Sequence, residues 1–173
     1  MKFVDCTLAR HGAAILDIYN DAIVNTTAIY DYRTRTMDSM VAWFKDKEGG
    51  RYPVIGAVSD DETLLGFATY GMWRVRPAYK YTVEHSLYVQ KNHRGEGIGD
   101  ALLKAIIDAA KEQGYHVLVG GIDAENAASI KLHLKHGFVH SGTVTQSGFK
   151  FGRWLDVAFY QLILPTPVNP VDG

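Results

Sequence analysis

The chain has 173 residues and a mass of 19.2 kDa, and 47% of its residues are hydrophobic and 21% charged. It is therefore long enough for one domain with its own core and too apolar for a disordered chain. Lys and Arg number 18 against 19 Asp and Glu, so the net charge of -1 argues against a general nucleic-acid binder. The single cysteine, Cys6, excludes an intrachain disulfide and a zinc site built on several thiolates. No segment is apolar enough for a signal core or a membrane helix, so we expect a cytoplasmic protein that binds neither membrane nor nucleic acid.

The first half of the chain predicts two helices followed by a pair of strands. Ile15, Ile18 and Ala22 recur at helical spacing, which indicates one apolar helix face. The apolar segments after Tyr52 are separated by a turn rich in Ser, Asp and Glu, which is typical of a β-hairpin. The elements expected here are helices at 9–24 and 37–47 and strands at 53–58 and 64–72.

The second of these helices has a mixed surface. We expect Met40, Val41 and Phe44 to face inward. Thr36 and Asp38 are both candidate N-caps, since either side chain can accept a hydrogen bond from a free N–H group of the first turn.

The second half alternates strands with helices. Residues 81–89 alternate in character, so that Val83 and His85 lie on one face and Glu84 and Ser86 on the other. Strands that alternate with helices, with strand pairs at both ends, predict a mixed α/β sheet with helices on both faces. The other expected elements are a helix after Gly99, strands at 116–122, 138–144 and 156–164, and a short helix at 126–136 capped by Asn126.

Residues 1–164 are expected to form one domain. Residues 165–173 contain three of the five prolines and are expected to be a C-terminal tail without a core role. Cys6 is expected in the first strand. Trp154 and Phe159 are expected in the core, because most aromatic side chains are buried.

A glycine-rich turn, Arg94-Gly95-Glu96-Gly97-Ile98-Gly99, separates a predicted strand from a predicted helix. Its glycines permit positive φ and a close approach of the backbone to an anion. The free N–H groups of the following helix point at the same place, which is typical of phosphate binding. The turn does not fit a P-loop, because Asp100 and Ala101 follow the last glycine in place of Lys and Ser or Thr. It does not fit a dinucleotide fingerprint, because the last Gly or Ala of that pattern would fall on Asp100 or Leu102. A connector without a ligand is the alternative.

This motif resembles the acetyl-CoA signature Gln/Arg-x-x-Gly-x-Gly/Ala of the GNAT superfamily of N-acetyltransferases. Further segments between residues 19 and 157 resemble its phosphinothricin and methionine sulfoximine acetyltransferase subfamily. The resemblance implies a GNAT-type, mostly antiparallel central sheet, acetyl-CoA as co-substrate, and a homodimer. The matching segments are Tyr19-Asn20-Asp21, Arg51-Tyr52-Pro53, Thr82 to Val89, Asn126-Ala-Ala-Ser129, His133, Gly137-Phe138 and Gly148-Phe-Lys-Phe-Gly-Arg-Trp-Leu-Asp-Val157.

The resemblance also implies a role for individual residues. The backbone of the strand before the glycine turn would pair with the pantetheine arm of the coenzyme, and the turn would wrap its pyrophosphate. The implied coenzyme contacts are Leu87, Tyr88, Val89, Arg94, Gly95, Glu96, Gly97, Ile98, Gly99, Asp100 and, near the reactive end, Asn126. The implied amino-acid site consists of Arg74, Val75, Arg76, Glu84, His85 and Ser86.

Acetyl transfer from a thioester to an amine requires an ammonium to lose a proton and a thiolate to gain one. Glu84 is the candidate base, because partial burial raises the pKa of a carboxyl. The alternative is a surface glutamate paired with Lys80 or Arg76. His133 is the candidate acid, because it stands four residues before Gly137, where many GNAT enzymes have a tyrosine. An ordinary helix-face histidine is the alternative.

We therefore expect transfer of acetyl to the α-amine of a small amino acid or analogue. The resemblance implies that methionine sulfoximine, methionine sulfone and phosphinothricin are such substrates. Direct attack in a ternary complex is expected, because the only thiol, Cys6, is far from the site in sequence. Arg74 and Arg76 suit a substrate with an anionic head group. The alternatives are an acetyltransferase for protein N-termini or antibiotics, and a non-catalytic coenzyme A or dinucleotide-binding module.

No metal is expected. His133, His136 and His140 match no common zinc spacing, and Gly137 interrupts the helix between them.

Overall fold

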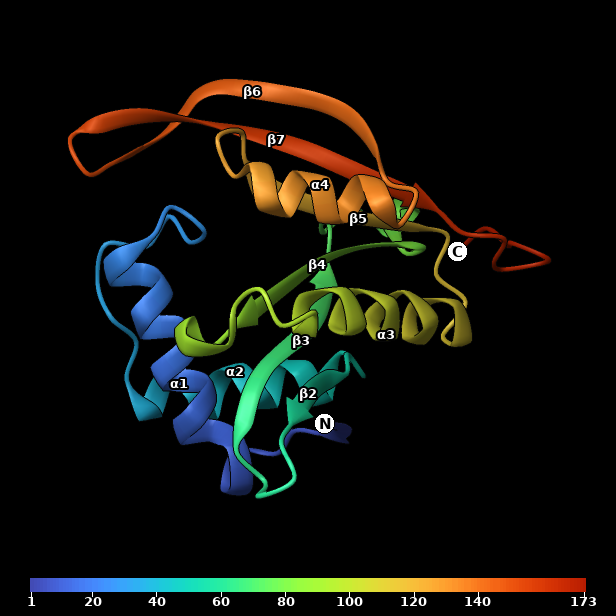
Figure 1. Ribbon diagram of the computed structural model, residues 1–173. Coiled ribbons are helices and arrows are strands. Elements are labelled where there is room, and N and C mark those ends of the chain that lie inside the picture. Colours follow the sequence, from blue (N-terminus) through green and yellow to red (C-terminus); the bar gives the residue numbers. More distant parts are fainter. The chain divides into compact units, whose positions relative to one another are not determined.

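The computed structural model describes residues 1–173 (Figure 1). The strands occur in the order β1-β2-β3-β4-β5-β7-β6 in one sheet. β4 pairs with β5 in parallel, whereas the β1–β2, β2–β3, β5–β7 and β6–β7 pairs are antiparallel, which confirms the mixed, mostly antiparallel α/β sheet. The elements are β1 (Lys2–Asp5), α1 (Leu8–Asn25), α2 (Met37–Gly49), β2 (Val54–Val58), β3 (Leu64–Met72), the short 3-10 helix η1 (Pro77–Tyr79), β4 (Thr82–Val89), the short 3-10 helix η2 (Lys91–His93), α3 (Ile98–Glu112), β5 (Val117–Asp123), α4 (Ala127–Lys135), β6 (Val139–Lys150) and β7 (Arg153–Ile163).

The chain divides into two compact units. One comprises residues 1–69 and 87–103, and the other comprises residues 70–86 and 104–173. β3, β4 and α3 each continue from one unit into the other along the chain. None of the helices has both the length and the apolar character needed to cross a lipid bilayer.

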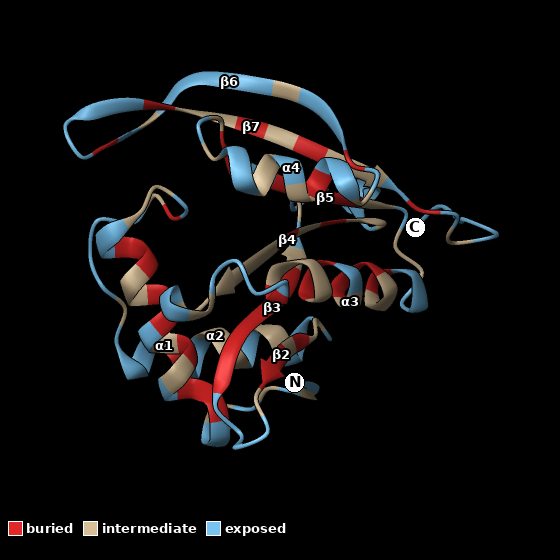
Figure 2. Cartoon of the chain, in the orientation of Figure 1, coloured by how far each residue is buried: buried red, intermediate tan, exposed pale blue.

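In the first unit, helices cover both faces of the strands. Tyr19 of α1 and Met40 of α2 share one buried apolar cluster with Phe67 of β3, and Figure 2 shows β3 buried along most of its length. The neighbouring Gly66 faces the other way, since a Cβ built on it would lie 3.2 Å from the Leu102 side chain of α3. Successive strand residues point to opposite faces. The predicted placement of helices on both sides is therefore confirmed within this unit.

The cap and inner face of α2 differ in part from expectation. Thr36 is the N-cap, with a complete capping box, so the alternative Asp38 is wrong. Met40 is fully buried, but Val41 is 48% exposed, so its inward placement is wrong. The buried face of α2 runs from Met40 to the half-buried Trp43. Val41 comes one residue after Met40 and therefore points about 100° away from that face.

The two closing strands are longer than the sequence predicts. β6 and β7 form a long hairpin whose strands run side by side (Figure 1). Phe151 and Gly152 join them with φ of 53° and 73°, the two left-handed positions of a type I′ turn. Trp154 is 59% exposed, so its expected core position is wrong. The reason is topological, because the pairing of β7 with β5 begins only at Val157 and leaves this end of the hairpin without a third strand.

Hydrogen bonds tie the C-terminal tail to the fold. The C-terminal tail contacts the second unit, where His116 Nδ1 lies 2.8 Å from the Thr166 carbonyl oxygen and the Val171 N–H donates to the Tyr81 hydroxyl at 3.0 Å. Cys6 follows β1 instead of lying in it, so that expectation is wrong by one residue.

Candidate active site

β4 carries residues predicted for both the coenzyme and the amine substrate. Its parallel pairing with β5 covers Thr82–Glu84 only, and Leu87–Val89 lie beyond the last paired residue. A strand edge of this kind can accept an extended ligand through backbone hydrogen bonds. The Tyr88 ring packs at 5.1 Å from the Tyr19 ring, so a coenzyme contact at this residue would use its backbone.

Residues 94–100 form the predicted anion-binding turn. Gly95 and Gly97 have φ of +86° and +82°, and a Cβ built on either would meet nothing within 4 Å. Glycine is therefore required by the backbone conformation, while the space above the turn is open. α3 begins at Ile98, and the first N–H groups of a helix have no partner within it. An open turn that ends in free N–H groups fits a phosphate.

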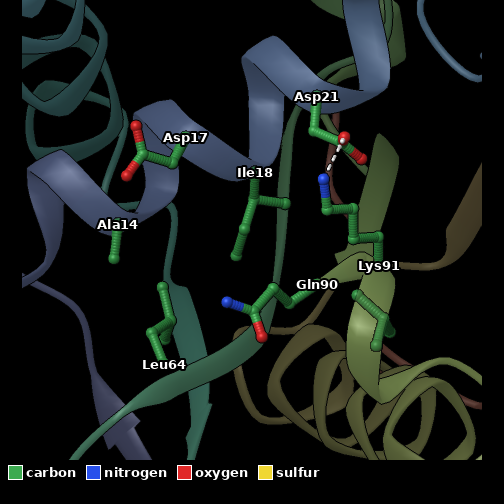
Figure 3. Close-up of a pocket in the computed structure, with 8 residues that line it drawn as sticks. Ala14, Asp17, Ile18, Asp21, Leu64, Gln90 and Lys91 are labelled. Carbon is green, nitrogen blue, oxygen red and sulfur yellow. Dashed lines mark ion pairs between the residues drawn. The ribbon is translucent and has the colours of Figure 1, made fainter. Parts of the chain in front are cut away.

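One carboxylate from α1 holds the basic side chains beside this turn. Asp21 lies 3.7 Å from Lys91 Nζ and 3.6 Å from an Arg94 guanidinium nitrogen. Asp21 and Lys91 both line a cavity of about 220 Å³. Figure 3 shows their side chains pointing toward each other there. Sequence reasoning did not connect Asp21 with the turn, because the two are far apart in the chain. The cavity is lined by Ala14, Asp17, Ile18, Asp21, Leu64, Val89, Gln90 and Lys91.

Glu84 is a half-buried carboxyl beside a glycine and a guanidinium. Burial raises its pKa, and the nearby Arg74 opposes that rise without cancelling it. Its Oε1 lies 3.2 Å from the position that a Cβ on Gly121 of β5 would occupy. The cation whose charge lowers the pKa of Glu84 is thus Arg74, and not Lys80 or Arg76. A carboxyl with a raised pKa is suited to exchange a proton near neutral pH.

His85 and His133 form a buried pair against β5. Their Nε2 atoms are 2.8 Å apart, and the two residues are 6% and 3% exposed. The Nδ1 of His133 lies 2.7 Å from the Ser129 carbonyl oxygen, so it donates there, and its Nε2 then accepts from the Nε2–H of His85. Gly120 of β5 makes room for the pair, because a Cβ there would lie 2.8 Å from the His85 ring.

The candidate base and the candidate acid lie on opposite faces of β5. Gly121 faces Glu84, and the preceding Gly120 faces both histidines. The structure therefore brings His85 together with His133 and not with Glu84, although His85 and Glu84 were expected in one amino-acid site. Both ring nitrogens of a neutral His133 are already hydrogen-bonded, so the two histidines hold each other in place on this face of β5.

The remaining predicted residues are on loops and at a helix terminus. Residues 74–76 are exposed after β3, and Ser86 is half-buried and shares the Glu84 face of β4. Asn126 is the N-cap of α4, as predicted, since its Oδ1 accepts a hydrogen bond from the Ser129 N–H at 3.1 Å. Its amide nitrogen is the part left for the predicted coenzyme contact.

The thiol of Cys6 is poorly suited to covalent catalysis. Burial, and to a smaller extent the charge of Asp5, raises its pKa to about 12. Very little thiolate exists near neutral pH, and the thiolate is the nucleophile. Within residues 1–173, no three His, Cys, Asp or Glu side chains gather as a metal-binding group.

Comparison with known proteins decides the family. Residues 13–138 match the Acetyltransferase (GNAT) family. This protein belongs to the GNAT acetyltransferase family. The matched GNAT segment includes β4 and the glycine turn, and the resemblance stated from the sequence is confirmed.

Relatives of this GNAT protein agree with the expected subfamily. The L-methionine sulfoximine/L-methionine sulfone acetyltransferase of Pseudomonas aeruginosa is 47% identical over 157 residues, which cover 90% of this chain and 91% of the relative. The phosphinothricin N-acetyltransferase of Streptomyces coelicolor is 34% identical over 149 residues, which cover 85% and 87%. A solved structure from Salmonella typhimurium with its cofactor acetyl-CoA is 41% identical, has a TM-score of 0.94, and is matched over 100% of this chain and 99% of that chain.

Acid is expected to destabilise this GNAT protein through its histidine pair. Burial lowers the pKa of both rings, and for His85, where His133 adds to the effect, the pKa falls from 6.5 to about 3. An unfolded histidine binds a proton near pH 6.5 and the folded pair does not, so the free energy of unfolding decreases as pH falls from 6.5 towards 3. Urea unfolding at several pH values measures this loss. His85→Gln should flatten the pH dependence, and the exposed control His140→Gln should not; equal slopes for the two variants would contradict the assignment.

Proposed function

We propose that this protein is an acetyl-CoA-dependent N-acetyltransferase that acetylates the α-amine of a small amino acid or analogue, such as L-methionine sulfoximine, L-methionine sulfone or phosphinothricin. The observation that carries the proposal is Glu84, a half-buried carboxyl with a raised pKa on the same strand as Leu87–Val89, only three residues before them. The names of the related acetyltransferases support this choice of substrate.

The first unit supplies residues suited to the coenzyme. Leu87–Val89 would hold its extended arm through backbone hydrogen bonds, and residues 94–100 would hold its pyrophosphate with N–H groups. The open space above Gly95 and Gly97 and the nearby Arg94 fit that role. Asn126 is proposed to contact the coenzyme near its reactive end. Bound there, acetyl-CoA supplies the acetyl group as an activated thioester.

Glu84 is proposed to take the proton that the substrate ammonium must lose, directly or through a water molecule. The bond from the amine nitrogen to the acyl carbon then forms, the bond from that carbon to sulfur breaks, and the thiolate leaves and takes up a proton. His133 as the source of that proton stays a prediction from the sequence. Its ring lies on the opposite face of β5 from Glu84, and both of its nitrogens are already hydrogen-bonded. Transfer is direct, because the high pKa of Cys6 makes it a poor acyl carrier.

Charged and polar residues around Glu84 are proposed to bind the amino acid. The charge of Arg74 lowers the pKa of Glu84, and the Arg74 side chain is exposed. Val75 and Arg76 follow it on the same exposed loop. Guanidinium groups suit the carboxylate, phosphinate or sulfone oxygens of such substrates. Ser86 is proposed to contribute from the Glu84 face of β4.

Two measurements on the intact protein test the proposed function. Acetyl-CoA is expected to raise the melting temperature, and NAD is expected to leave it unchanged. Release of free thiol should then follow addition of methionine sulfone or methionine sulfoximine, but not of a peptide with a free N-terminus. A thermal shift without thiol release from any amino acid would show a coenzyme-binding module and refute the enzyme.

The proposed assembly is a homodimer. The tip of the β6–β7 hairpin exposes Phe149, Phe151 and Trp154, and β6 is an edge strand of the sheet. Exposed apolar clusters and open strand edges are common association surfaces. Light scattering should give twice the chain mass of 19.2 kDa. The cytoplasmic location and the domain limits of 1–164 stay predictions.

A further inference from the structure

Gly121 is an exposed residue within an otherwise covered strand. β5 lies between β4 and β7 in the sheet, and its residues on either side of Gly121 are buried. An inner strand is normally covered on both faces by side chains. Gly121 has no side chain, and its backbone is open to solvent. The sheet surface therefore has a gap at this position.

Three side chains surround the place of the missing Cβ. A Cβ on Gly121 would lie 3.2 Å from Glu84 Oε1, 3.4 Å from the Phe159 ring and 3.6 Å from Val157. Phe159 is directly opposite Gly121 in the antiparallel register, and no bulge interrupts that pairing. The space above the glycine is therefore bounded by a carboxylate on one side and apolar side chains on the other.

Trp73 and Arg74 extend the apolar side of this space with an aromatic ring and a guanidinium group. Trp73 meets Phe159 edge-on, with ring centroids 5.6 Å apart. The Arg74 guanidinium carbon lies 5.1 Å from the Trp73 ring centroid. A carboxylate, a guanidinium and an apolar wall around one open position are the three groups that recognise the ammonium, the carboxylate and the side chain of an amino acid.

We propose that the space above Gly121 receives the amine-bearing carbon of the substrate, so that Gly121 determines the specificity of the reaction. The inference rests on the proposed function, because Glu84 can accept a proton only from an amine within hydrogen-bonding reach of its carboxylate. Oε1 of Glu84 lies 3.2 Å from the place of a Cβ on Gly121. A substrate amine that is hydrogen-bonded to Oε1 would therefore have its α-carbon above this glycine. Any side chain at position 121 would occupy this space.

Gly121→Ala tests the assignment with a single added methyl group. Gly121 has no left-handed φ, so alanine suits its backbone, and the end of the flexible Glu84 side chain can yield a few tenths of an ångström. The melting temperature and the Kd for acetyl-CoA should therefore stay unchanged. The KM for methionine sulfone should rise at least about tenfold, and calorimetric binding of methionine sulfone to the protein saturated with coenzyme A should weaken equally.

Gly49→Ala is the matched control, because a Cβ there meets nothing within 4 Å, and it should leave both values unchanged. Val157→Ala is a second variant, and it widens the same space. The ratio of kcat/KM for valine to kcat/KM for methionine sulfone should rise by at least about threefold. Unchanged KM and binding in Gly121→Ala, or unchanged selectivity in Val157→Ala, would overturn the inference. Failure of the unmodified protein to acetylate any amino acid would instead refute the proposed function.

Discussion

Replacing Glu84 by glutamine is expected to lower kcat for acetyl transfer by about 10²- to 10⁴-fold. The amide cannot take the proton of the substrate ammonium, and an ammonium has no lone pair with which to attack. The substitution changes neither the backbone of Leu87–Val89 nor the glycine turn, so acetyl-CoA should still raise the melting temperature as it does in the unmodified protein. Thiol release and thermal shift, measured on the same samples, separate these two effects.

The exposed Glu112 at the end of α3 provides the matched control, and Glu112→Gln should retain full activity. The pH profile gives a second check. Because burial raises the pKa of Glu84, the rate should fall as pH decreases through a value above the ordinary 4.5 of a glutamate. Glu84→Gln should lose this acidic limb. Activity within a factor of about three of the unmodified protein in Glu84→Gln would falsify the role of base.

Gly120→Ala is expected to cause the largest loss of stability among the substitutions considered, about 1–3 kcal/mol. A Cβ at this position would lie 2.8 Å from His85 Cε1 and 3.3 Å from His133 Nε2. The histidine rings are buried and hydrogen-bonded to each other, so neither can move away without breaking the pair. Urea unfolding with a constant m-value measures the change.

The neighbouring glycine on β5 is the sharpest control for this effect. Gly121→Ala adds the same methyl group to the same strand, but at the one exposed position of β5, so its unfolding midpoint should match that of the unmodified protein. Equal midpoints for Gly120→Ala and the unmodified protein would show that the histidine pair is not held against β5 as described.

Elements with local signals could be predicted from the sequence. The glycine turn, the helix that follows it, and the N-cap role of Asn126 depend on residues within a few positions of one another, and each has the expected conformation. The hairpin turn at Phe151 was missed, because a left-handed φ is uncommon for a phenylalanine and gives no signal in the pattern of residues. Trp154 was placed in the core from its type alone, although no third strand covers it.

The sequence by itself determined the family and the α/β class, and it supplied the residues that we propose for acetyl transfer, because those depend on motifs that are continuous in the chain. The tertiary structure alone decided that Glu84 and His133 lie on opposite faces of β5, that His85 is the partner of His133, and that Gly121 leaves an open position beside Glu84. These relations join residues of different strands and helices. They are set by the register of β4, β5 and β7 and by the side to which each residue points, and neither is written in any single segment.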